Sequence, residues 1–155
     1  MQILKPGDPA PSFRLRDADE KEYTIEQFKG NRIVLYFYPK DDTPGCTKEA
    51  CSFRDDYDDY SENDIVIIGI SADSSASHKK FAEKHKLPFI LLSDPEKEVL
   101  KKYDAWGEKK MYGRSYFGVI RKTFLIDEKG KILKIFPKVR VEGHSESILK
   151  EFGIK

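Results

Sequence analysis

Two cysteines, Cys46 and Cys51, are the only thiols of this chain and stand five residues apart. The preceding Thr43-Pro44-Gly45 is typical of a helix start, with Thr43 as N-cap and Pro44 at the first helical position. Cys46 then occupies the third helical position. There, free backbone N–H groups and the positive end of the helix dipole favour a thiolate over a thiol. The sequence therefore predicts a reactive sulfur, the alternative being an inert buried cysteine.

The spacing to Cys51 sets a geometric condition on any reaction between the two sulfurs. On one regular helix, residues five apart lie roughly 7.5 Å apart along the axis and about 140° apart around it. A disulfide requires Cα atoms closer than about 7 Å with facing Cβ atoms, so the pair cannot bridge while helical. We therefore expect the helix to unwind if Cys46 is to reach Cys51. The alternative is that Cys51 is a small core residue that never reacts.

A thiolate also benefits from a fixed cation, and Arg121 is the strongest candidate. It follows the apolar pair Val119-Ile120 and stands directly before the strand-like segment 122–127. An arginine that enters a sheet needs an anionic partner and keeps its charge when partly buried. On position alone, a surface ion pair with one of the many acids is an equal alternative.

Metal binding and hydrolysis are weaker interpretations of the same residues. Zinc sites usually combine closer cysteines with further Cys or His ligands, and His78, His85 and His144 have no such spacing. We expect no metal, and expect His78 and His85 on a helix surface. A cysteine hydrolase needs a base histidine placed by the fold. Position leaves that open for His144, but no local motif supports it.

Three apolar segments, 32–38, 65–71 and 89–92, predict buried strands of a parallel sheet. Helical patterns cover 47–60 and 74–85. Another helix is expected with Asp94 as N-cap and Pro95 at its first position, turning Val99, Leu100 and Tyr103 inward. This alternation of strands and helices predicts the α/β class.

Hairpins and a last helix complete the expected order of elements. Segments 122–127 and 131–136 flank a turn with Gly130, and 12–15 and 22–25 suggest a small N-terminal hairpin. A last helix is expected at 145–152. The order predicts a central mixed sheet with helices on both faces, for which a thioredoxin-like fold is the candidate.

Bulk properties limit the classes of function. A length of 155 residues fits a single domain over 1–155, and the net charge of +1 predicts no attraction to nucleic acid or anionic membranes. No segment has the apolar core of a signal peptide or the roughly 20 apolar residues of a membrane span. We therefore expect a cytoplasmic protein, in whose reducing compartment two cysteines are more often catalytic or redox-sensing than a structural disulfide.

Together these residues resemble the peroxiredoxins, and within them the bacterioferritin comigratory protein, or PrxQ, group. The family's pattern of Pro, three residues, Thr or Ser, two residues and Cys matches Pro39, Thr43 and Cys46. Segments 36–50, 103–113 and 121–127 are also similar to that group, so the resemblance extends over nearly the whole chain.

The resemblance implies a thiol peroxidase that needs no cofactor. Cys46 would attack the peroxide, Thr43 would hydrogen-bond the reacting atoms, Arg121 would stabilise their charge, and Pro39 would shield the pocket from water. Cys51 matches the resolving position of members that form an intramolecular disulfide. The reductant would be thioredoxin or a similar dithiol, and the group suggests a monomer. Glu49 is similar to an acid of the family, without a firm role.

Three other kinds of protein with a related fold differ from this sequence in their cysteine motif or in their electron donor. Thr43 stands where the Cys-x-x-Cys motif of thioredoxin has its first cysteine, which argues against general disulfide reduction. A thioredoxin-fold copper carrier is the alternative from another class, but its cysteine pair is one residue closer together. A glutathione-peroxidase-like enzyme would differ mainly in its electron donor.

Overall fold

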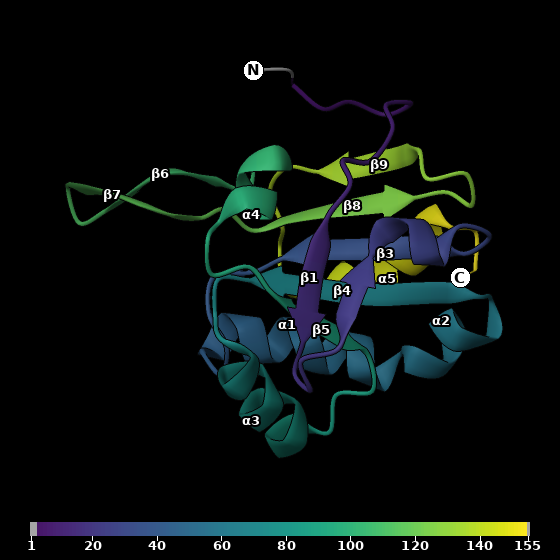
Figure 1. The fold of residues 1–155 in the computed structure, drawn as a ribbon, viewed down its shortest axis with the longest axis horizontal. Coiled ribbons are helices and arrows are strands. Elements are labelled where there is room, and N and C mark those ends of the chain that lie inside the picture. Colours follow the sequence, from purple (N-terminus) through teal and green to yellow (C-terminus); the bar gives the residue numbers. More distant parts are fainter. Residues whose placement is uncertain (1–2, 155) are drawn as a thin grey trace.

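The computed structural model describes residues 3–154, whose main feature is a seven-stranded mixed sheet with the order β2-β1-β5-β4-β3-β8-β9 (Figure 1). The central strands β3, β4 and β5 pair in parallel, and the other pairings are antiparallel. The expected mixed sheet and the N-terminal hairpin β1–β2 are confirmed. The strands are Arg14–Asp17 (β1), Glu22–Thr24 (β2), Arg32–Phe37 (β3), Ile65–Ser71 (β4), Ile90–Ser93 (β5), Lys122–Ile126 (β8) and Ile132–Phe136 (β9).

Strand β3 is buried on both faces because its side chains alternate between two core clusters. Leu35 and Phe37 point into one cluster, and Val34 and Tyr36 point into the other. An alternation in which both sets are apolar is what a central strand covered on both faces requires. The polypeptide that leaves β3 therefore emerges from the middle of the sheet, and this is where Cys46 follows.

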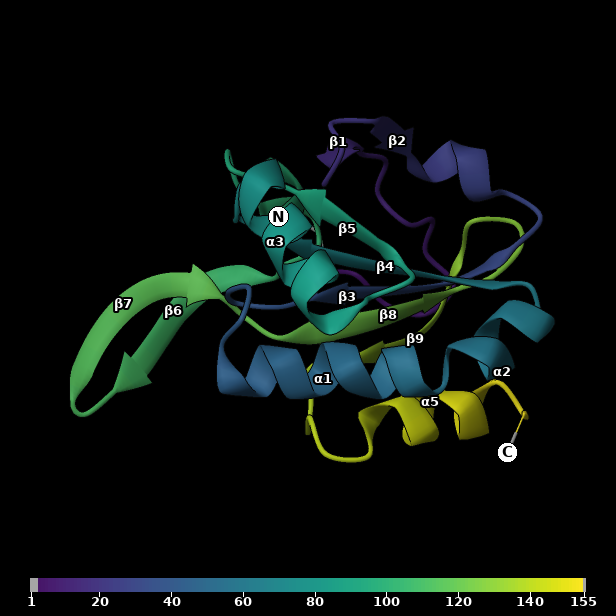
Figure 2. The ribbon, with the colours of Figure 1, turned by 90° about the horizontal axis from the view of Figure 1, so that it is seen from below.

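Helices cover both faces, as expected. On one face Phe53, Phe81 and Ile148 share a core cluster and belong to α1 (Pro44–Asp55), α3 (Ser75–His85) and α5 (His144–Glu151). Figure 2 shows α1 and α5 side by side beneath the sheet. On the other face lie α4 (Glu98–Lys102) and the 3-10 helix η1 (Ile25–Phe28), through Leu100 and Ile25. Within residues 3–154, no helix has the length and apolar character needed to cross a bilayer.

The helix expected at 47–60 is two helices in the structure. The first, α1, begins earlier, at Pro44, and ends at Asp55, and the second, α2, covers Tyr57–Glu62. Between them Asp56 leaves helical geometry, and its carboxylate accepts a hydrogen bond of 2.7 Å from the Ser145 hydroxyl of α5. The break therefore coincides with an attachment to the neighbouring helix.

The expected cap at Asp94 is wrong, although Val99, Leu100 and Tyr103 are buried as expected. Helix α4 starts only at Glu98, after Lys97 in the left-handed conformation. The Asp94 carboxylate still accepts the Leu100 N–H at 2.8 Å, so it satisfies a backbone donor of the helix from a buried position outside it.

A second, two-stranded sheet was not predicted. Strands β6 (Trp106–Met111) and β7 (Arg114–Val119) pair around Tyr112 and Gly113, which both have positive φ angles, and the hairpin projects from the body of the molecule (Figures 1 and 2). Large side chains on it are exposed, including Tyr112 and Phe117. Only its base, through Trp106 and Val119, packs against a core cluster of the described residues, so most of its sequence lacks the apolar alternation that identifies strands.

The close pairing of Gly69 with Tyr36 gives a test of the packing behind α1. These residues face each other on β4 and β3, and a Cβ atom on Gly69 would lie 2.8 Å from Cζ of the buried Tyr36 ring. We expect Gly69→Ala to lower the free energy of unfolding by about 1–3 kcal/mol in urea denaturation of the reduced protein. Gly118→Ala is the control, because its new methyl group meets nothing closer than 3.4 Å. Equal stability of both variants would contradict this packing.

Candidate active site

The polypeptide between β3 and α1 delivers Cys46 to the third position of α1. Thr43 has the extended backbone of an N-cap and Pro44 is the first helical residue, so the expected helix start is confirmed. The Thr43 hydroxyl does not cap the helix, however, because it donates to the Lys40 carbonyl at 2.8 Å. Cys46 is 2% exposed, and Pro39 lies half-buried in the same loop.

Arg121 connects the sulfur with a buried carboxylate. Its Nη2 atom lies 3.3 Å from Cys46 Sγ, and Nη1 donates to Glu49 Oε1 at 2.6 Å. The guanidinium comes from the junction of β7 and β8, which lies beside the end of β3 because Phe37 pairs with Lys122. Gly45 leaves room for it, since a Cβ atom there would lie 3.3 Å from Nη2. The anionic partner expected for Arg121 is thus both the sulfur and Glu49.

Glu49 is the most unusual acid of the site, because it is completely buried. Burial raises its pKa to about 7, although the charge and the hydrogen bond of Arg121 act in the opposite direction. Its second oxygen, Oε2, has no hydrogen-bond partner within residues 3–154. Sequence reasoning gave Glu49 no role. Its position three residues after Cys46 was the available signal, since residues three apart share a helix face.

Two further groups lie within electrostatic range of the sulfur and were not predicted. Lys109, on β6, donates to the Val119 carbonyl at 2.9 Å, and its pKa is lowered chiefly by burial and then by Arg121. The phenol of Tyr36 has its pKa raised chiefly by burial and further by Glu49 and Cys46. The sulfur therefore lies in a site that combines two cations with low solvent access.

Cys51 is half-buried on the same helix as Cys46, and both thiols are free. Since α1 is continuous from Pro44 to Asp55, the spacing of roughly 7.5 Å along the axis and about 140° around it applies. The two sulfurs do not converge, so the intact helix supports neither a disulfide nor a copper site made from this pair.

His144 does not act on the sulfur in this structure. Its Nε2 atom pairs with the Thr123 hydroxyl at 2.8 Å, and burial lowers its pKa to about 4. The hydrogen bond to Cys46 Sγ comes from Arg121. A hydrolase arrangement with His144 as the base is therefore absent from the described residues.

The expectation that His78 lies on a helix surface is wrong, because its ring is fully buried. With Asp41 and Asp73 it forms a group of potential metal-ligating atoms within 4.8 Å of one another. Hydrogen bonds within the group account for this proximity: His78 Nδ1 lies 2.7 Å from Asp41 Oδ2, and the Asp41 N–H donates to Asp73 Oδ2 at 2.8 Å.

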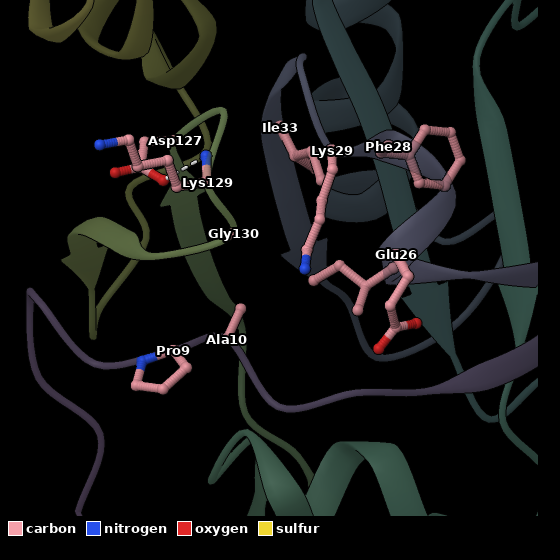
Figure 3. Close-up of a pocket in the computed structure, with 10 residues that line it drawn as sticks. Pro9, Ala10, Glu26, Phe28, Lys29, Ile33, Asp127, Lys129 and Gly130 are labelled. Atoms are coloured by element: carbon pink, nitrogen blue, oxygen red, sulfur yellow. Dashed lines mark hydrogen bonds between the residues drawn. The ribbon is translucent and has the colours of Figure 1, made fainter.

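A cavity of about 220 Å³ lies away from these groups, between η1 and the β8–β9 turn (Figure 3). It is lined by Ile33 at the start of β3, whereas the Cys46 loop leaves the opposite end of that strand. Its charged side chains include Glu26 of η1, Lys29 directly after η1, and the turn residue Asp127, which accepts backbone N–H groups of its own turn. None of the groups around Cys46 lines this cavity.

Comparison with known proteins identifies the family to which this arrangement belongs. Residues 6–135 match the AhpC/TSA family. The chain is 47% identical to peroxiredoxin Bcp of Bacillus subtilis over 144 residues, which cover 93% of this chain and 92% of that protein. It is 42% identical to peroxiredoxin Bcp of Escherichia coli over 149 residues, or 96% of each chain.

Solved structures give the same result. The chain superposes on PrxQ of Xylella fastidiosa with a TM-score of 0.92 and 30% identity, over 99% of this chain and 98% of that one. With the bacterioferritin comigratory protein of Xanthomonas campestris, whose alkyl peroxide reduction activity has been described, the TM-score is 0.86 at 33% identity, with 92% of each chain covered. The expected thioredoxin-like fold is thereby confirmed. The chain belongs to the AhpC/TSA family and is a thiol-dependent peroxidase of the Bcp/PrxQ group of peroxiredoxins.

Proposed function

We propose that the chain reduces hydrogen peroxide and organic hydroperoxides with Cys46 as the attacking thiolate. The contact of Arg121 Nη2 with Cys46 Sγ, 3.3 Å, carries this assignment, because it places a permanent cation on the sulfur at a helix start. The X. campestris relative with described alkyl peroxide reduction supports this substrate class.

In the first step the thiolate attacks one oxygen of the peroxide and the O–O bond breaks. Cys46 becomes a sulfenic acid, and the leaving hydroxide or alkoxide takes up a proton to depart as water or an alcohol. Arg121 stabilises the negative charge as it moves from sulfur to oxygen. The Thr43 hydroxyl donates to the Lys40 carbonyl and so turns its oxygen lone pairs to accept the peroxide O–H. Half-buried Pro39 limits the access of water.

In the second step Cys51 resolves the sulfenic acid. Its thiol sulfur attacks the Cys46 sulfur, an intramolecular disulfide forms, and water leaves. Because the sulfurs lie on different sides of one helix, the first turns of α1 unwind before this bond can form. The break at Asp56 and its contact with Ser145 support an unwinding that stops before α2.

The third step returns the enzyme to its reduced state. A thioredoxin-like dithiol attacks the disulfide, so both cysteines become thiols again and the dithiol becomes a disulfide. Two free thiols on one helix support work in the reducing cytoplasm. We also propose a monomer formed by one domain over residues 1–155, which sedimentation of the reduced protein at several concentrations tests.

Substituting each cysteine separates the roles of the two thiols. We expect Cys46→Ser to abolish peroxide consumption, because a serine hydroxyl is not ionised at neutral pH. We expect Cys51→Ser to consume about one equivalent of peroxide and then to stall with thioredoxin as reductant. Peroxide consumption is followed with thioredoxin, its reductase and NADPH. Full, continuous turnover of Cys51→Ser with thioredoxin would contradict the resolving role, and turnover of Cys46→Ser would contradict the attacking role.

The buried carboxyl of Glu49 predicts a dependence of stability on pH. Its pKa is about 7 in the folded protein and 4.5 in the unfolded one, so the folded state holds the extra proton between these values. The stability it contributes is complete below pH 4.5 and is lost as the pH rises through 7, by about 3 kcal/mol in total.

Glu49→Gln removes this titration but keeps an oxygen that can accept from Arg121. We therefore expect the difference in free energy of unfolding, variant minus wild type, to increase by about 3 kcal/mol between pH 4.5 and pH 7. Urea denaturation of both proteins across this range measures it. Titration of His144 contributes equally to both and cancels. Parallel pH profiles of the two proteins would show that Glu49 is not a buried titrating acid.

A further inference from the structure

The buried ring of His78 is held by hydrogen bonds on both sides. Nε2 lies 3.0 Å from the Leu92 carbonyl oxygen, which can only accept, so Nε2 is the donor of that bond. Nδ1 lies 2.7 Å from Asp41 Oδ2 and 3.3 Å from the hydroxyl of Tyr38, which itself donates to Asp41 Oδ1 at 2.6 Å. The ring therefore connects Asp41, in the loop after β3, with the backbone of β5.

Asp41 is the partner shared by the side chains around this ring. Its carboxyl group bonds to Tyr38 and His78, and also accepts from the Ser77 hydroxyl at 2.8 Å. Three partners satisfy a carboxyl group that is 7% exposed, as a buried polar group requires. The carboxylate of Asp73 lies beside this pair and accepts the Asp41 N–H. A buried pair with complete hydrogen bonding fixes its two elements firmly relative to each other.

The next residue extends the attachment along the same helix. Asp42, in the left-handed conformation, pairs with Lys84 at 2.8 Å and with His85 at 3.0 Å. His78 and His85 are seven residues apart and therefore lie on one face of α3, two turns from each other. Successive carboxylates of the loop that leads to Cys46 are thus both attached to α3.

The loop needs such an attachment because the two halves of the reactive contact come from different parts of the chain. Cys46 is carried by the β3–α1 loop, and Arg121 by the β7–β8 junction. Their separation of 3.3 Å depends on both segments being held in place, and Asp41 lies only five residues before Cys46.

We propose that His78 is a positioning residue for the peroxidase reaction: its ring holds Asp41, and through it the Thr43–Cys46 helix start, in register with Arg121. This inference rests on the proposed function of Cys46. His78 touches neither substrate nor sulfur and acts through the loop. A displacement of about 1 Å in a reacting group can lower a rate by up to about 100-fold, so its loss should be visible in the rate.

Two variants separate the two bonds of the ring. His78→Asn places an amide N–H near the position of Nδ1 and keeps a donor to Asp41, whereas His78→Gln reaches toward Leu92 and loses that donor. We expect kcat/KM for hydrogen peroxide, per folded molecule, to fall roughly 10–100-fold in His78→Gln and to recover by at least threefold in His78→Asn. His144→Asn, a buried histidine bonded to Thr123 outside this loop, is the control and should stay within about twofold of wild type.

A purely structural role for His78 gives a different result. In that case both His78 variants would lose stability in urea, as His144→Asn would, while the rate per folded molecule stayed within about twofold of wild type. That outcome would overturn the positioning role. Equal losses of rate in His78→Asn and His78→Gln would also overturn it, since the bond to Asp41 would then not decide the rate.

Imidazole ¹⁵N spectra test the hydrogen bond between His78 and Asp41 directly, even if the His78 variants fail to fold. The Nδ1 signal of His78 should change strongly in Asp41→Asn, whereas the Nε2 signal, whose partner is the Leu92 carbonyl, should change little. An Nδ1 signal that is the same in both proteins, or one that changes on addition of Zn²⁺ to the wild type, would overturn the inference. The spectra do not depend on peroxide turnover, so they distinguish failure of this inference from failure of the proposed function.

Discussion

The geometry of one helix governs the chemistry of this protein. Helix α1 carries both cysteines, and five residues of α-helix separate them by roughly 7.5 Å along the axis and about 140° around it. The same helix start creates the environment that favours the Cys46 thiolate. A reactive sulfur thus needs the helix, whereas a disulfide with Cys51 needs its absence. In the proposed mechanism, reduction of peroxide and resolution of the sulfenic acid therefore require two different conformations of one segment.

The reduced conformation is held by contacts that end close to the sulfur. Arg121 bridges Cys46 and Glu49, so its guanidinium group, a thiol and a carboxyl group lie together in a site with little access to water. This arrangement is unfavourable for the charged form of Glu49. Burial raises the pKa of its carboxyl group by more than Arg121 lowers it, and within residues 3–154 its Oε2 atom has no hydrogen-bond partner. Beyond the cysteines, the Asp56–Ser145 contact attaches the end of α1 to α5. Cys51 lies between the Arg121 contacts and this attachment, and the proposed mechanism requires the segment from Cys46 to Cys51 to unwind.

The elements predicted correctly from the sequence are those whose local residue pattern matches their place in the fold. The apolar strands β3 and β4 were predicted because two buried faces leave a continuous apolar run, and the start of α1 because Thr43, Pro44 and Cys46 each fit their helical positions. Arg121 was predicted from its place before a strand together with the resemblance, and its contact with the sulfur is seen in the structure.

The failures have physical reasons as well. His78 was expected on a helix surface, although His78, Phe81 and His85 recur at the spacing of one helix face. Its burial is made possible by partners far away in sequence or on another strand, Asp41 and the Leu92 carbonyl. The β6–β7 hairpin contacts the core only through Trp106 and Val119 at its base, so apolar periodicity could not identify it. Such tertiary partners lie beyond any local window of sequence.

Peptide mass mapping after one equivalent of hydrogen peroxide shows whether Cys46 and Cys51 form a disulfide with each other. The reduced protein is treated at low concentration, free thiols are alkylated, and the peptides are analysed without reduction. We expect one cross-linked species in which Cys46 and Cys51 of the same chain are joined, a bond that the intact α1 helix forbids. An alkylated Cys51 beside a Cys46 that is a sulfinic acid, or is bonded to another chain, would contradict it.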